Sequence, residues 1–148
     1  MYMYRNDCRK ILLPYLVNLS EEEWFKQTVY YPKNIAWIIA HIVDSEDYWI
    51  NEVWLKKPSI VNLHEKSKPA EILKAYTDIR TYSDQLFINQ SPSEMDTLIE
   101  VPEFGDGWKP PSPPTVKWLF NHLYSHEIYH VGQLAIIARL NDITPPPF

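Results

Sequence analysis

Two histidines four residues apart, His126 and His130, are the residues of this chain best placed to do chemistry. They lie in the sequence HEIYH, which matches the HExxH pattern of zinc peptidases. Such peptidases also need a third ligand after the motif, either a glutamate or the last histidine of HExxHxxGxxH. The residues after His130 include neither Glu nor His, and Gln133 and Ile136 stand where the longer pattern has Gly and His. We therefore expect no peptidase.

Both histidines fall in the middle of an apolar helical stripe. At about 100° per residue, with Leu119 at zero, His126 lies near ~340° and His130 near ~20°, beside Leu123 and Ile137. Burying an imidazole without a partner costs on the order of 1–3 kcal/mol, so two neighbouring ones need a reason. Hydrogen bonds to neighbouring helices would be one such reason. We favour a shared divalent metal ion, because this spacing lets two imidazoles bind one ion.

A third ligand has to come from upstream, and the residues leave the choice open among His41, His64 and several carboxylates. His64 lies in PSIVNLHEKSKP, a stretch expected to be a connecting loop. His41 follows the apolar run IAWIIA on an expected helix. His122 lies about 12 Å from His130 along the helix axis, too far to share an ion whose ligands are ~3–4 Å apart. The helical geometry permits His41 without selecting it.

Proline punctuates the chain and delimits four long helical segments. In the first segment, Ser20 and Glu23 form the pattern of a capping box, and Pro14 predicts a kink or a break, so we expect two helices there. Residues 91–114 are too rich in Pro and Gly to be helical, and the glycines of FGDG predict a short hairpin around 97–109. We predict one all-α domain over residues 1–148. Its fold is an antiparallel four-helix bundle with this short β-hairpin between helices 3 and 4. The four helical segments cover about 6–28, 34–55, 69–89 and 113–141.

The composition argues against several kinds of partner. A formal charge of −5 at pH 7, with few adjacent basic residues, excludes a nucleic-acid surface. No apolar run approaches a membrane span, no signal peptide is visible, and the single cysteine, Cys8, cannot form an internal disulfide. We therefore expect a cytoplasmic protein. The 6 Trp, 10 Tyr and 5 Phe exceed what one small core readily buries, which favours a homodimer.

Two stretches taken together, IAWIIAHIVDSEDYW and HLYSHEIYHVGQLAIIARL, resemble the DinB-like family of bacterial four-helix proteins. The resemblance covers nearly the whole chain, and its most specific part is one histidine in the second helical segment with H-x-x-x-H-x-G-Q in the fourth. It implies one divalent metal ion per chain, zinc or nickel, bound by His41, His126 and His130, and it also implies homodimers. Val131 replaces the arginine often found before the glycine, and Gly132, inside a helix, suggests close helix packing.

Three neutral imidazoles would leave at least one coordination position open, as in catalytic sites. An open position makes a bound water or thiol more acidic, so hydrolysis of a small molecule or transfer of a small thiol could follow. Family members with assigned chemistry include thiol users, which favours thiol transfer and a low-molecular-weight thiol as co-substrate. Glu127 is the best nearby base, or else a solvated glutamate. The remaining candidates to surround the site are His122, Gln133, Ser45 and Tyr48.

The alternative is a metal-binding or ligand-binding dimer without turnover. In that case a fourth protein group, such as Asp44 or Glu127, would close the coordination shell. The number of protein ligands at the metal therefore separates an enzyme from a binding module.

Overall fold

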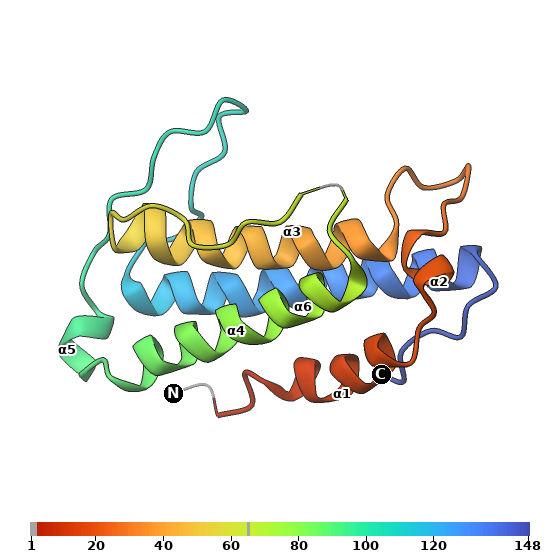
Figure 1. Cartoon of the computed structure of the whole chain (residues 1–148). Coiled ribbons are helices and arrows are strands. Elements are labelled where there is room, and N and C mark those ends of the chain that lie inside the picture. The colour runs from red at the N-terminus through yellow and green to blue at the C-terminus, as the bar shows by residue number, and fades with distance from the viewer. Residues whose placement is uncertain (1–2, 65) are drawn as a thin grey trace.

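The computed structural model describes residues 3–64 and 66–148 and is mostly helical (Figure 1). The long helices confirm the all-α prediction closely: the second, third and fourth begin and end within a few residues of the expected bounds. Asn34 caps the second by accepting a hydrogen bond from the Trp37 N–H, and Pro69 begins the third. The elements are α1 (Asp7–Val17), α2 (Glu21–Phe25), α3 (Ile35–Asp47), the π-helix η1 (Tyr48–Trp54), α4 (Pro69–Ile88), α5 (Pro92–Met95) and α6 (Val116–Leu140).

The first segment forms two helices, but the break does not fall at Pro14. Helix α1 continues through Pro14 to Val17. Leu12 and Leu16 are fully buried on the inner face of α1, and this packing outweighs the one backbone hydrogen bond that the proline removes. Helix α2 then starts with the expected capping box, in which Ser20 and Glu23 each satisfy the other's backbone N–H.

The helices do not all alternate in direction along the chain. Figure 1 shows α3 and α4 running the same way, while α1 and α6 run the opposite way. The reason is the connection over residues 56–68, whose described residues 56–64 return along α3 before α4 begins. The buried carboxylate of Asp47 holds this connection in place by accepting hydrogen bonds from the Ile60 and Val61 N–H groups, at 2.9 and 2.7 Å. The antiparallel arrangement that we expected therefore does not hold between α3 and α4.

The hairpin expected around 97–109 is not confirmed. Among the described residues this region has no strand, only an isolated bridge between Leu98 and Thr115. Prolines explain the difference, because the residues that would continue the second strand after Trp108 include Pro110 and Pro111, which have no N–H to donate. The segment instead closes through the Ile99 N–H, which donates to the Pro114 carbonyl at 2.8 Å. The short helix α5 (Pro92–Met95) lies just before it and corrects the expectation that residues 91–114 hold no helix.

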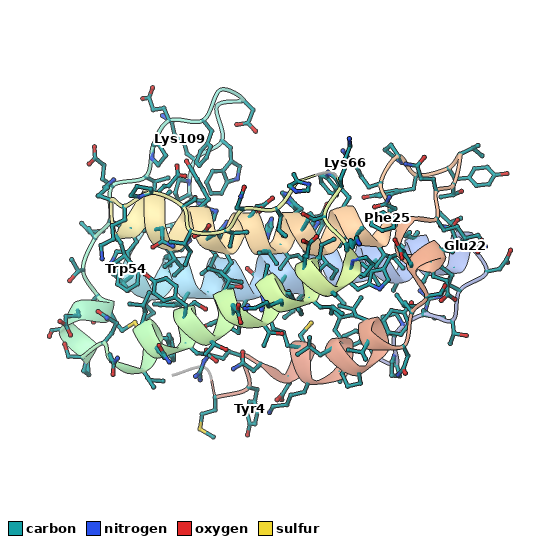
Figure 2. All side chains as sticks on the ribbon, in the orientation of Figure 1. Tyr4, Glu22, Phe25, Trp54, Lys66 and Lys109 are labelled. Atoms are coloured by element: carbon teal, nitrogen blue, oxygen red, sulfur yellow. The ribbon has the colours of Figure 1, made fainter. Side chains whose placement is uncertain are left out.

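Side chains fill the space between the helices in two apolar clusters (Figure 2). One joins α1, α2, α3, α4 and α6 around residues such as Ile38, Tyr76 and Leu134. The other joins η1 to the ends of α4 and α6 around Trp49 and Phe120. In the part of the chain that the structure describes, no helix is long and apolar enough to cross a membrane.

Candidate metal centre

Three histidines from two helices meet between α3 and α6. Each of His41, His126 and His130 offers one ring nitrogen, and these three atoms all lie within 4.8 Å of one another. The Nε2 atoms of His126 and His130 are 3.0 Å apart. The His41 ring centroid lies 5.1 Å from that of His126 and 4.5 Å from that of His130. The structure therefore selects His41 as the upstream partner, while His64 is exposed on the 56–68 connection.

The two helices bring the rings together for simple geometric reasons. His126 and His130 are one turn apart on α6, so their side chains point from the same face. Helix α3 packs along α6 through its apolar face, which buries Ile38 and Ile42, and His41 lies at the edge of that face. Trp37, one turn before His41, stacks on its ring at 4.8 Å between centroids and nearly parallel, at 8°. This stacking fixes the plane of the His41 imidazole.

Burial keeps the three rings neutral. Desolvation lowers the pKa of His41 and His130, and it lowers the pKa of His126 to about 3, with further contributions from the other histidines. A neutral imidazole has one nitrogen lone pair free, which is the form that binds zinc and nickel. Three converging lone pairs repel one another unless a proton or a cation lies between them. The donor set therefore fits a divalent ion, and these three histidines could hold one.

Gln133 orients one of the three rings. Its Oε1 lies 2.7 Å from Nδ1 of His130. When that Nδ1 carries the proton and donates to the amide oxygen, the Nε2 lone pair points toward the other two rings. A hydrogen bond of this kind commonly fixes the tautomer of a metal-binding histidine. Gly132, next to Gln133, is exposed, and a Cβ there would meet nothing within 4 Å, so close helix packing does not account for this glycine.

His122 lies outside the three-histidine group, in an aromatic box. Its ring stacks on Trp118 at 5.0 Å and 10°, and it meets Trp49 at 4.8 Å and Trp108 at 5.8 Å. Its centroid is 5.9 Å from that of His126. Residues far apart in the sequence form this box, so the one-dimensional pattern gave no sign of it. The box packs Trp108 of the 97–114 segment against η1 and the first turns of α6.

The structure does not bring Glu127 to the histidines. Its carboxylate is 1 % exposed and forms salt bridges with Arg9 at 2.6 Å and Arg80 at 2.9 Å, and it also accepts a hydrogen bond from the Tyr76 hydroxyl. Ser45 and Tyr48 are half-buried on α3 and η1, and among the described residues neither has a hydrogen bond to the three imidazoles. Tyr48 contacts Trp49 instead.

Glu127 belongs to a buried network of four charges that sequence reasoning missed. Glu46 completes it, bound to Arg9 at 2.6 Å and to Arg80 at 2.8 Å. Burial alone would raise the pKa of Glu46, but the two guanidinium charges outweigh it and lower that pKa to about 2. The two positive and two negative charges balance and tie α1 and α4 to α3 and α6. No local signal could reveal it, because Arg9 and Glu127 are 118 residues apart.

The chain is similar to known proteins over most of its length. The sequence profile of the DinB superfamily matches residues 6–134, a range that includes all three histidines. The chain is also similar to a Bacillus subtilis (strain 168) protein named "Uncharacterized protein YizA". The two are 27 % identical over 127 residues, which cover 86 % of this chain and 77 % of that protein. The histidine group, the helical fold and the profile match lead to one conclusion: the chain belongs to the DinB superfamily.

Proposed function

We propose that this protein is a metal-dependent enzyme that transfers a small thiol to an electrophilic small molecule. One divalent ion, zinc or nickel, would be held by His41, His126 and His130 between α3 and α6. The observation that carries the proposal is the composition of the site: three imidazole nitrogens lie within 4.8 Å of one another, and no carboxylate of the described residues joins them. Sites with three protein ligands keep a coordination position for substrate, whereas structural zinc sites usually have four.

The same composition favours thiol transfer over hydrolysis. An ion bound here would make a thiol or a water in its open position more acidic. A free thiol has a pKa of about 8.5, so an ion alone can deprotonate it at neutral pH. Free water has a pKa of about 15.7, so its deprotonation usually requires a base in addition to the ion. The base expected from the sequence, Glu127, is occupied by Arg9, Arg80 and Tyr76. We therefore assign Glu127 to holding the helices together rather than to proton transfer.

The remaining residues would bind and orient. Gln133 would keep the Nε2 lone pair of His130 directed at the ion through its contact with Nδ1. Trp37 would keep the His41 ring in its plane by stacking. His122, in its aromatic box, would form one wall of the approach to the site. We also infer that α1, α3, α4 and α6 form one four-helix bundle that carries this site.

Elemental analysis of protein purified without added metal tests the site. We expect about one divalent ion per chain, and we expect His126→Ala or His130→Ala to abolish stoichiometric metal, because two imidazoles rarely hold zinc. His64→Ala is the matched control, since His64 is an exposed histidine outside the group, and it should keep its metal. Metal that survives His41→Ala but disappears in His64→Ala would show that the third ligand is wrong.

Turnover needs a separate measurement. The metal-loaded protein is screened with pairs of small thiols and electrophiles, and the same screen is run after chelation. Thioether formation that depends on metal would support the enzyme. If the loaded protein turns over no pair and its metal has a fourth protein ligand, the proposed activity is wrong and the protein is a binding module.

A further inference from the structure

A cavity of about 520 Å³ adjoins the metal group on the outer side of α3. It lies between α3, the 56–68 connection and the segment that leads into α3. Figure 2 labels Phe25 and Lys66 on the two segments that border this end of α3. His41 belongs both to the wall of this cavity and to the three-histidine group. A molecule in the cavity would therefore lie within one imidazole ring of an ion held by the group.

The residues that line the cavity are apolar, neutral polar or acidic. Phe25, Trp37 and Leu63 give it an apolar surface, and Asp44 is the acidic residue in it. None of the residues that line it is Lys or Arg. The ammonium of Lys33 lies over the Trp37 ring at 4.1 Å from the centroid, and Lys33 is not part of the lining. The cavity thus combines apolar side chains with neutral polar ones, from Gln27, Asn34 and Ser67, and with one exposed carboxylate, that of Asp44.

The segment that covers the cavity is held by specific contacts. The Asp47 carboxylate binds the backbone of Ile60 and Val61. Further along, the His64 N–H donates to the Ser67 hydroxyl at 3.1 Å, and Ser67 is 3 % exposed. These contacts shape the covering segment before any ligand arrives, so a ligand would enter a preformed space.

We propose that this cavity binds the substrate of the metal centre, and that Asp44 selects a substrate carrying an ammonium group a short distance from its metal-binding atom. The inference rests on the proposed function for the metal itself. Asp44 follows His41 by three residues, and side chains three apart on a helix have Cβ atoms about 5–6 Å apart. A two-carbon link between a sulfur and a nitrogen suits that separation. A substrate of this kind is small, with an anionic donor atom at one end and a cation at the other.

Three thiols of similar size distinguish this selection from general thiol binding. Cysteamine carries an ammonium, 2-mercaptoethanol is neutral, and 3-mercaptopropionate carries a carboxylate. With cobalt(II) in the site, thiol binding is followed by the sulfur-to-cobalt absorption band in the near ultraviolet. We expect cysteamine to bind about fivefold more tightly than 3-mercaptopropionate, a ratio in keeping with one partly exposed ion pair. The neutral thiol should fall between them.

Asp44→Asn should reduce that preference to within about twofold, while cobalt content and the affinity for 2-mercaptoethanol stay unchanged. Asp78→Asn is the matched control, because Asp78 is an exposed carboxylate on α4 paired with Lys74, and it should keep the full preference. Equal affinities in the wild-type protein, or a preference that survives Asp44→Asn, would overturn the role of Asp44.

A second ligand pair separates this inference from the proposed activity. If no thiol changes the cobalt spectrum, thiol transfer is wrong, and glycine hydroxamate is then compared with acetohydroxamate, which lacks the ammonium. A preference for glycine hydroxamate that Asp44→Asn removes would support the cavity assignment without thiol chemistry. Equal binding of the two hydroxamates, or binding of neither, would overturn it.

Discussion

Replacing Glu46 by Gln removes one of two buried negative charges that balance Arg9 and Arg80. Glu46 is 2 % exposed, and its pKa is lowered from 4.5 to about 2, because the guanidinium charges outweigh the opposing effect of burial. At about 1.4 kcal/mol per pKa unit, that difference corresponds to about 3 kcal/mol of folding free energy at pH 7. Breaking a buried ion pair typically costs about 3–5 kcal/mol. We therefore expect Glu46→Gln to lower the free energy of unfolding by about 3 kcal/mol.

The decrease in the free energy of unfolding caused by Glu46→Gln should become smaller as the pH falls. Because the pKa of Glu46 is lower in the folded chain, its contribution is fully present above about pH 4.5 and is lost as the pH falls toward about 2. The three histidines of the site also weaken the folded chain in acid, since their lowered pKa values let the unfolded chain take up more protons. That effect is common to both proteins. The difference between wild type and Glu46→Gln therefore isolates the carboxylate.

Urea unfolding of the metal-free protein, followed by circular dichroism at several pH values between 7 and 3, measures this difference. Glu100→Gln is the control, because the Glu100 side chain is 88 % exposed, and it should change the free energy of unfolding by less than about 0.5 kcal/mol. A loss below about 1 kcal/mol for Glu46→Gln, or a difference as large at pH 3 as at pH 7, would refute the role assigned to the network.

Two further predictions concern Cys8 and the oligomeric state. Burial, with the charge of Glu127, raises the pKa of Cys8 to about 12, so iodoacetamide at pH 8 should label it at least ~100-fold more slowly in the folded than in the urea-unfolded chain; equal rates would contradict the burial. Exposed apolar side chains on α6, at Ile128, Tyr129 and Ile136, favour a homodimer. Sedimentation should give about twice 17.6 kDa, and Ile136→Glu should shift it to the monomer; a wild-type monomer at micromolar concentration would contradict this.

Local signals in the sequence were enough to place the helices and one side of the site. Pro69 at a first turn and the Ser20–Glu23 box act through backbone groups within a few residues, so they can be recognised without the fold. The pairing of His126 with His130 follows from the helical period alone. The third ligand could not be identified from the helical period, which left His41 and His64 both possible. The resemblance to the DinB-like family indicated His41.

Tertiary packing decided what depends on distant partners. A helical wheel places Glu127 about 100° from His126 and cannot say whether that direction leads to solvent or to Arg9 and Arg80. The parallel run of α3 and α4 depends on Asp47 binding the backbone of the 56–68 connection, and the same connection creates the cavity beside Asp44. These interactions join segments many residues apart, and their energies arise only once the helices have packed. Sequence periodicity reports which face of a helix is buried, whereas only the packed structure determines which groups meet there.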